Sequence, residues 1–315
     1  MKLMRMLALV LAAVSASSAI ADGRAVDETR DAQLDGFISI NVMRGDVRLV
    51  GWDRPAISVE GTLDEKTEEF VFDTSGSETR IMVKVKDRNS GWYDNYGSDL
   101  TIRVPAASQV EFGGVSTDVS ARDLAGVLEI GVVSGDLDVD GGVSRIDLQT
   151  VSGDVVLRNS SGRVSISTVS GDVETYDTVG DASYSTVSGN IRVEDGGTEL
   201  RLESVSGDIE VRNDLMNVVG GHSVSGDIEI EGQPTAKPAI EFDAVSGSIR
   251  LRLKGTVNAR FDIETGSGSI RNRLSDHKPR TARYTQEETL KFTLGSGDGQ
   301  ITLTTRSGDI SISGS

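Results

Sequence analysis

Apolar and polar residues alternate along the middle of this chain in a pattern that repeats every 18 residues. Between Val127 and Met216, a valine followed by Ser-Gly-Asp or Ser-Gly-Asn occurs five times. The serines of these turns are Ser134, Ser152, Ser170, Ser188 and Ser206. With each repeat numbered from Arg145 as position 1, positions 2, 4, 7, 11 and 13 are mostly apolar, and positions 3, 5 and 12 are mostly polar. Such regularity indicates a stack of one repeated supersecondary unit.

The alternation at positions 2 and 4, and again at 11 and 13, has the period of two that is typical of half-buried strands. The Ser-Gly-Asp segments and a second polar cluster, Asn159–Gly162 in one copy, have the composition of turns. One repeat cannot bury its apolar face alone, whereas a parallel stack buries these faces inside a closed coil. We therefore predict an all-β parallel β-solenoid with 18-residue coils, a right-handed β-helix by the usual handedness of parallel crossovers.

Two alternative architectures fit the pattern less well. An antiparallel meander would leave a long apolar face without a cover, because no helical pattern accompanies the strands. A left-handed hexapeptide helix would need aliphatic residues six apart, but position 1 holds charged residues such as Arg145 and Asp181. The parallel solenoid with 18-residue coils is therefore favoured.

The repeat also predicts where particular side chains lie. Because position 7 is valine in every regular copy, we expect Val151 and Val169 to stack inside the core. Glycine at position 9, as at Gly153 and Gly171, is expected in turn conformations that are closed to other residues. Toward the end of the chain, Gly297-Asp298 and Ser307–Asp309 are expected to form the last two turns of the chain.

The chain divides into three parts around a regular core at residues 109–232. Residues 1–21 begin with Lys2 and Arg5, continue with a short apolar run and end in Ala-Ile-Ala, so we predict a signal peptide that is cleaved near Ala21. Residues 22–111 are predicted to form a divergent N-terminal β region or cap, and residues 112–315 the solenoid repeats. The expected product is exported, periplasmic or secreted, with no membrane span in the mature chain.

Composition narrows the function classes. The 315 residues carry a net charge of −17, so we expect no binding to nucleic acid and no non-specific binding to anionic lipid. Cysteine is absent, so stability cannot depend on disulfides although export would permit them. Only 4% of the residues are aromatic, which disfavours an aromatic carbohydrate-binding groove.

A search for catalytic and metal-binding patterns identifies one candidate. Asp136, Asp154, Asp172 and Asp208 share position 10 and are expected to stack about 5 Å apart, where calcium could neutralise them. The column is interrupted by Asn190 and by serines, and calcium-binding glycine-rich repeats are absent, so we expect no strong calcium dependence. Two histidines, His222 and His277, have no metal partner at helical or hairpin spacing. We therefore predict no catalytic residues, no metal and no cofactor.

Three short segments are candidates for binding. Trp92, Tyr93 and Tyr96 lie in a Gly/Asn/Asp-rich stretch and are expected either to cap the end of the solenoid or to contact a partner. The tripeptide Arg44–Asp46, which integrins recognise, is expected to be another solenoid turn because Val-Arg-Leu follows it as in the repeats. The basic segment Arg271–Tyr284 is interpreted as charge balance in an inserted loop.

The Val-Ser-Gly-Asp-Val turns, the Val104-Pro105 step and the ending Gly295–Asp298 with Arg306–Ile310 resemble a bacterial family. It is the putative-adhesin family of β-strand-repeat domains of unknown function, related to the GIN head domain of putative autotransporter adhesins. The resemblance covers the chain from about Phe37 to its end and implies a single-chain solenoid without established catalytic residues. We predict a non-enzymatic, adhesin-like or envelope-associated scaffold whose partner is a surface protein or polysaccharide. The alternatives are a polysaccharide-active β-helix enzyme and a calcium-dependent structural module.

Overall fold

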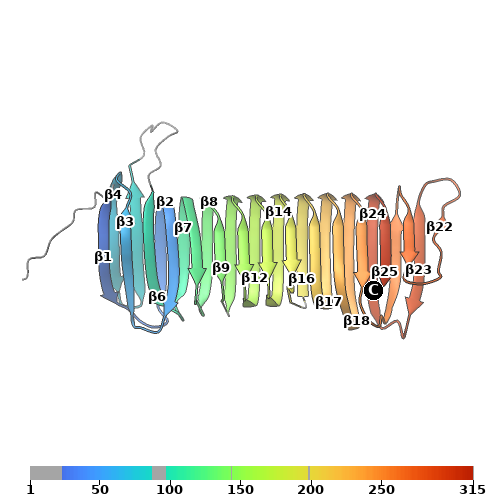
Figure 1. Cartoon of the computed structure of the whole chain (residues 1–315), viewed down its shortest axis with the longest axis horizontal. Helices are drawn as coiled ribbons and strands as arrows, with labels where there is room; N and C mark the ends of the chain where they lie inside the picture. Colours follow the sequence, from blue (N-terminus) through green and yellow to red (C-terminus); the bar gives the residue numbers. More distant parts are fainter. Residues whose placement is uncertain (1–22, 87–96, 143, 198, 315) are drawn as a thin grey trace, which may run out of the picture.

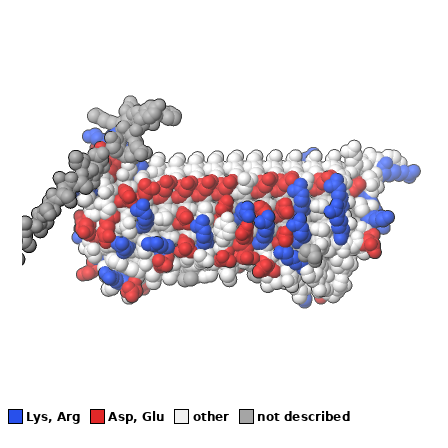
Figure 2. All heavy atoms as spheres, viewed as in Figure 1, with Lys and Arg blue, Asp and Glu red and all other residues white. Residues whose placement is uncertain are grey.

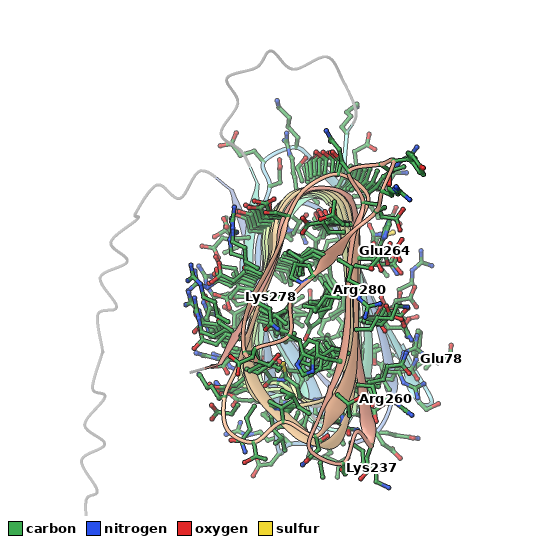
Figure 3. All side chains as sticks on the ribbon, turned by 90° about the vertical axis from the view of Figure 1, so that its right-hand side faces the viewer. Glu78, Lys237, Arg260, Glu264, Lys278 and Arg280 are labelled. Atoms are coloured by element: carbon green, nitrogen blue, oxygen red, sulfur yellow. The ribbon has the colours of Figure 1, made fainter. Side chains whose placement is uncertain are left out.

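The structure is a computed structural model that describes residues 23–86, 97–142, 144–197 and 199–314. Their strands connect into one 25-stranded β arrangement, elongated along a single axis (Figure 1). Seen along that axis, successive coils superimpose as a flattened ring (Figure 3). The described residues contain no helix. The predicted all-β architecture is therefore confirmed.

The strands follow one another with short turns between them. The N-terminal part contains β1 (Arg24–Asp31), β2 (Phe37–Trp52), β3 (Ala56–Leu63), β4 (Thr67–Ser75), β5 (Glu78–Val85), β6 (Ser98–Pro105) and β7 (Gln109–Arg122). The regular part contains β8 (Val127–Ser134), β9 (Leu137–Asp140), β10 (Arg145–Ser152), β11 (Val155–Arg158), β12 (Ser161–Ser170), β13 (Val173–Tyr176), β14 (Val179–Ser188), β15 (Ile191–Glu194) and β16 (Glu199–Ser206). The C-terminal part contains β17 (Ile209–Ser225), β18 (Ile228–Ser246), β19 (Ile249–Leu253), β20 (Ala259–Thr265), β21 (Ile270–Arg273), β22 (Arg280–Thr281), β23 (Glu288–Leu294), β24 (Gly299–Ser307) and β25 (Ile310–Gly314).

Each regular coil contributes one long and one short strand, which form the two broad faces of the solenoid. The long strand β10 pairs in parallel with β12, and Arg145 lies opposite Arg163. The short strand β11 pairs in parallel with β13, and Val155 lies opposite Val173. Partners are thus 18 residues apart, as the repeat predicts. The right-handedness of the coil stays a prediction.

The core is filled from positions 2, 4 and 6 of the long strand and positions 11 and 13 of the short strand. Val164, Ile166 and Val173 are each at most 1% exposed. The expectation that Val151 and Val169 stack in the core is wrong, because both are 45% exposed. The period of two continues through position 6, so position 7 necessarily points outward.

Position 6 mostly holds small hydroxyl residues whose side chains point inward toward a turn, with Val132 as an exception. Thr150 and Thr186 are buried, and each donates a hydrogen bond to a glycine carbonyl of the preceding coil, at 3.4 Å. The buried Thr305 does the same to Gly247 at 3.0 Å. The hydroxyl satisfies the turn carbonyl from inside the solenoid, and a larger apolar side chain could not do so.

Two exceptions to the apolar pattern lie next to each other inside the core. Position 13 holds Thr175 where other coils have an aliphatic residue, and position 4 of the next coil holds the fully buried Tyr184. The tyrosine hydroxyl faces the hydroxyls of Thr175 and Thr178, although none of these contacts has full hydrogen-bond geometry. Burial raises the pKa of Tyr184, so this hydroxyl stays neutral.

The turn glycines are required mainly because neighbouring coils come very close. A Cβ on Gly171 would lie 2.0 Å from the carbonyl oxygen of Gly153, and one on Gly153 would lie 2.0 Å from that of Gly135. Gly153 has φ of 158°, whereas Gly171 lies outside the left-handed range, so the expected turn conformation is wrong for Gly171. Both positions are nevertheless closed to side chains, through backbone contact rather than through φ alone.

We expect Gly171→Ala to lower the free energy of unfolding by about 1 kcal/mol or more, because the added methyl group meets backbone atoms that cannot move without separating two coils. Gly131→Ala is the matched control, since a Cβ there has no atom within 4 Å, and it should change stability by less than about 0.5 kcal/mol. Urea denaturation of both variants measures the difference. Equal losses would show that coil spacing is not what demands glycine.

At the N-terminal end, strands that are distant in sequence lie next to each other. β2 pairs in parallel with β7 on one side and with β5 and β6 on the other. The outermost strands β1, β3 and β4 run antiparallel to their partners. Strands that run antiparallel to their partners therefore cover the N-terminal end of the parallel stack.

At the C-terminal end, the last coil in sequence is not the last coil in space. β24 pairs in parallel with both β18 and β20, and β25 pairs in parallel with both β19 and β21. We call residues 299–314 the inserted coil, because they lie between two coils that precede them in the chain. The turn at Ser307–Asp309 is thus the last turn in the chain but lies inside the stack. The register is set by ladder pairing, which does not require the order of the chain.

The end of the stack is instead covered by the antiparallel strand β23 and by the segment before it. Phe292 of β23 stacks on Phe261 with ring centroids 4.4 Å apart, and His277 stacks on Phe292 at 5.0 Å. Leu274 packs against the hydrophobic core. In Figure 3, Lys278 and Arg280 lie in front of this end. The basic segment predicted to be an inserted loop thus forms part of a cap.

Candidate functional site

The aspartates at position 10 form a hydrogen-bonded column along one edge of the solenoid. Asp118 Oδ1 accepts the backbone N–H of Asp136 at 2.9 Å, and Asp136 Oδ1 accepts that of Asp154 at 2.8 Å. In the same way, Asp154 Oδ1 accepts the backbone N–H of Asp172, and Asp208 Oδ1 accepts that of Asp227. Figure 2 shows a row of acidic side chains along the upper part of the face. Each carboxylate therefore fixes the turn of the next coil.

The residues that interrupt the column preserve its hydrogen bonds. Asn190 accepts from Asp208 N–H through its side-chain oxygen at 2.9 Å. Where serine occupies position 10, its backbone N–H still donates to the neighbouring carboxylate. The N–H of Ser269, for example, donates to Asp309 Oδ1 at 2.8 Å. The backbone and hydroxyl hydrogen bonds from Ser269, with the nearby charge of Arg271, lower the pKa of Asp309. Most turns therefore have a side chain at position 10 that accepts a hydrogen bond from the next coil. That side chain does not have to be a carboxylate.

Within the described part of the chain, no group of three or more His, Cys, Asp or Glu side chains is arranged to hold a metal ion. The weak metal candidates Asp136, Asp154, Asp172 and Asp208 do stack, but one oxygen of each accepts a backbone hydrogen bond.

We expect excess calcium to leave the melting temperature unchanged, because the turns are already satisfied by their own hydrogen bonds. Circular dichroism melts with calcium and with chelator measure this. A rise of several degrees that Asp154→Asn and Asp172→Asn abolish would instead support the calcium-dependent module.

Position 7 produces a continuous exposed apolar row beside the aspartates. Its members are between 37% and 48% exposed, and together we call them the valine edge: Val115, Val133, Val151, Val169, Val187, Val205, Val224 and Val245. The spacing of stacked strands places them about 4.8 Å apart along the axis. Single exposed apolar residues are ordinary, but a contiguous row is typical of an interaction surface.

A hollow of about 400 Å³ opens on the long-strand face around Gly220. Gly220 and Gly221 occupy positions 3 and 4 of their coil and pair with Glu241 and Phe242. A Cβ on Gly221 would lie 2.6 Å from the ring of Phe242, so the large core residue of one coil requires glycine in the next. Because Gly220 has no side chain on the outer face, the backbone is exposed there.

Polar side chains surround this hollow. His222 Nδ1 lies 2.6 Å from Asp243 Oδ1, and the two side chains are 44% and 54% exposed. Glu203, opposite His222 in the register, completes a column of three titratable residues at position 5. Arg201 and Glu241 line the hollow beside them. The cluster can bind a polar ligand by hydrogen bonds.

Sequence analysis did not find this cluster. Asp243 is 21 residues from His222, which is neither a helical nor a hairpin spacing, so the local sequence does not connect the two. Aligning the turn serines Ser206, Ser225 and Ser246 would have shown that Glu203, His222 and Asp243 share a column.

The remaining binding candidates have different outcomes. Trp92, Tyr93 and Tyr96 lie outside the described residues. Arg44–Asp46 is a solenoid turn as expected, since Asp46 pairs with Asp118. Arg44 forms an ion pair with Asp64, whose side chain is fully buried. Burial would raise the pKa of Asp64, but the hydrogen bonds and charges of Arg44 and Lys66 outweigh it and lower this pKa.

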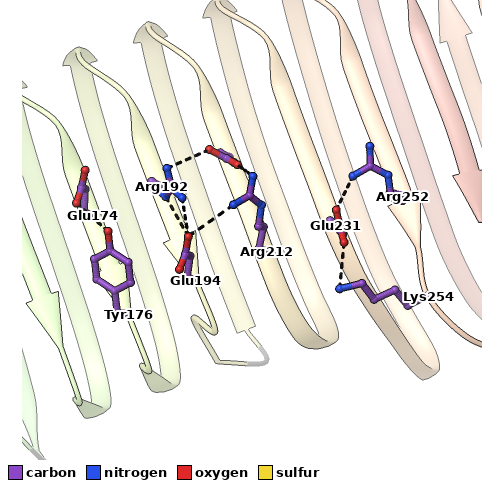
Figure 4. Close-up of polar contacts among 9 residues, drawn as sticks. Glu174, Tyr176, Arg192, Glu194, Arg212, Glu231, Arg252 and Lys254 are labelled. Carbon is purple, nitrogen blue, oxygen red and sulfur yellow. Dashed lines mark hydrogen bonds and ion pairs between the residues drawn. The ribbon is translucent and has the colours of Figure 1, made fainter. Parts of the chain in front are cut away.

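The short-strand face carries ladders of alternating charge (Figure 4). Arg192 contacts Glu194 at 2.7 Å, and Arg212 contacts Glu194 at 3.7 Å. Lys254 contacts Glu231 at 3.1 Å. Some of these pairs lie within one strand and others link neighbouring coils, and such partly exposed pairs contribute little stability individually.

Comparisons with known proteins identify one family and several similar solved structures. The family model described as Toastrack DUF4097 matches residues 37–313. A solved structure of a putative adhesin from Parabacteroides distasonis is similar at 12% identity, covering 92% of this chain and 98% of the other with a TM-score of 0.42. One from Bacteroides fragilis, also described as a putative adhesin, has 13% identity, coverage of 92% and 97%, and a TM-score of 0.39. A putative lipid binding protein from Parabacteroides distasonis has 14% identity, coverage of 92% and 98%, and a TM-score of 0.41.

No curated protein matches the chain. Among the described residues, no helix has the length and hydrophobicity needed to cross a membrane.

Proposed function

The chain belongs to the Toastrack DUF4097 family, and we propose that it is an exported, non-enzymatic interaction scaffold that binds an envelope or surface protein through its valine edge. The observation that carries this proposal is the exposed row from Val115 to Val245. Rigid stacked coils hold these side chains in a straight line, so a partner can bury many of them without reorganising the scaffold. The relation to the GIN head domain stays a prediction from the sequence.

Export rests on the sequence of residues 1–21, with its positive start, short apolar run and Ala-Ile-Ala end. We propose that the mature protein begins near Asp22 and is periplasmic or secreted. A net charge of −17 favours solubility in that compartment and disfavours partners that are strongly acidic.

The experiment compares capture of envelope proteins by the mature chain and by the variant Val133→Ser, Val151→Ser, Val169→Ser. These side chains are 45–48% exposed, so the variant should fold normally and lose the captured partner. The control variant Asp138→Ser, Val156→Ser, Glu174→Ser changes the outer side of the short strands in neighbouring coils. Equal capture by both variants would contradict a role for the valine edge.

A second candidate function, polysaccharide hydrolysis, is favoured by the hollow around Gly220. Glu203 and Asp243 lie on either side of His222 in one column, and glycoside hydrolases use two carboxyl groups that flank the scissile bond. Release of reducing ends from envelope polysaccharide, lost in Glu203→Gln, would establish the enzyme. Release that persists in this variant would indicate a contaminating activity.

A further inference from the structure

The inserted coil creates a surface that the order of the sequence conceals. On the short-strand face, β25 presents Ser311 and Ser313 outward, between β19 on one side and β21 on the other. Ser311 is paired with Arg250 and Arg271, while Ser313 is paired with Arg252 and Arg273. The two serines therefore lie between a pair of arginines on β19 and a pair of arginines on β21, and we call each pair an arginine column. We call this arrangement the arginine groove.

The geometry of the groove follows from strand spacing. The two arginine columns are two ladder steps apart, about 9.6 Å between Cα atoms, and the arginines within each column are about 6.7 Å apart. The groove encloses a hollow of about 270 Å³. In Figure 2 two basic stripes lie near the C-terminal end of this face, separated by a pale stripe. Guanidinium groups can thus reach a small ligand from both sides, with serine hydroxyls beneath it.

The arginines are partly engaged by carboxylates, of which Glu229 lines the hollow at its β19 side and the others lie outside the lining. Arg250 contacts Asp227 at 3.0 Å and Arg271 contacts Asp309 at 3.1 Å. Arg252 forms ion pairs with Glu229 and Glu231 of β18, which adjoins β19 on the side away from the serines. Arg273 has no ion pair with any residue that the structure describes. Each guanidinium has five donors, so a single carboxylate contact leaves others available.

We infer that the arginine groove binds a tetrahedral oxyanion, a phosphate or sulfate group. Its oxygens accept hydrogen bonds from Arg273 and from the free donors of Arg250 and Arg271, while Ser311 and Ser313 donate from below. Guanidinium and hydroxyl groups match such an anion because it offers acceptors in several directions.

The surroundings favour a small anion over an extended polyanion. The carboxylates of Asp227 and Asp309 lie at the side of the groove nearest the turns, Glu229 borders the hollow from β18, and Glu231 lies outside its lining. A long polyanion crossing these positions would be repelled, whereas one phosphate or sulfate group fits between the two arginine columns.

The test is isothermal titration calorimetry of the mature protein with sodium phosphate, sodium sulfate and sodium acetate at constant ionic strength. We expect saturable binding of phosphate and sulfate, and much weaker binding of acetate, which has fewer acceptors. Arg273→Gln should weaken phosphate binding about tenfold, the scale of one charge-assisted hydrogen bond. Arg306→Gln is the matched control, because it removes the same charge from the inserted coil at position 7, outside the groove.

Ser311→Glu is a second test variant, and we expect it to fold normally. The new carboxylate would lie between Arg250 and Arg271, so the melting temperature should hold or rise while phosphate and sulfate binding is lost. Absence of saturable binding in the unsubstituted protein would overturn the inference. So would equal weakening by Arg273→Gln and Arg306→Gln, which would indicate general charge attraction instead of a site.

Discussion

Replacing Val164 by aspartate is expected to lower the free energy of unfolding by more than about 4 kcal/mol. Val164 is 1% exposed at position 2 and stacks between Ile146 and Ala182 of the adjacent coils. The substitution removes an apolar contact and places a carboxyl group where no partner is available. Because each coil is stabilised by its neighbours, the damage should spread to both sides of the altered coil.

The control is the same substitution five residues later. Val169 belongs to the same coil but is 45% exposed on the valine edge, so Val169→Asp should cost about 1 kcal/mol or less. Chemical denaturation of both variants measures the difference. Similar losses, or a larger loss for Val169→Asp, would mean that the valine edge is buried and that the register described here is wrong.

Ending the chain after Asp298 is expected to unfold the C-terminal part of the solenoid. The truncation removes the ladder partners of both β18 and β20, and it exposes the core residues Phe242 and Phe261 that Leu303 and Ile301 face in the register. The coils up to β17 keep their neighbours. We therefore expect an early melting transition separate from the main one, and rapid proteolysis between residues 254 and 298.

A synthetic peptide of residues 299–315 provides the control for this truncation. Added in trans, it should restore proteolytic protection, because the gap between β18 and β20 accepts only a parallel strand of that apolar pattern. A scrambled peptide should not. A truncated chain that melts in one step at the original temperature would contradict the insertion of the last coil.

The repeat predicted the stack, the strand pairing and the turn columns because each follows from a fixed spacing of 18 residues. Valine at position 7 resembles a core residue by its hydrophobicity, but its place in the alternation puts it on the outside. Position 6 holds threonine at Thr150 and Thr168, which looks polar, yet both are buried and Thr150 bonds a turn carbonyl. A strict period of two from Val164 and Ile166 would have placed Thr168 inside and Val169 outside.

The order of coils at the ends could not be predicted in the same way. Parallel ladders form between any two coils with matching apolar positions, so Ile301 and Leu303 could follow either β18 or β20. Neither the arginine groove nor the contact between His222 and Asp243 is visible until that order and the lengthened repeats are known. The Asp column was placed correctly, but its role in accepting backbone N–H groups appears only when consecutive coils are seen together.

The insertion of the last coil is tested most directly by disulfide formation, because the chain has no native cysteine. Ser246 and Ser307 are register partners, so their Cα atoms are about 4.8 Å apart, within disulfide range. Ser246 and Ser267 are separated by the inserted coil and should be about 9.6 Å apart, beyond that range. Under mild oxidation, Ser246→Cys with Ser307→Cys should cross-link fully, while Ser246→Cys with Ser267→Cys should stay reduced. Cross-linking of the second pair and not the first would place the coils in chain order and contradict the fold described here.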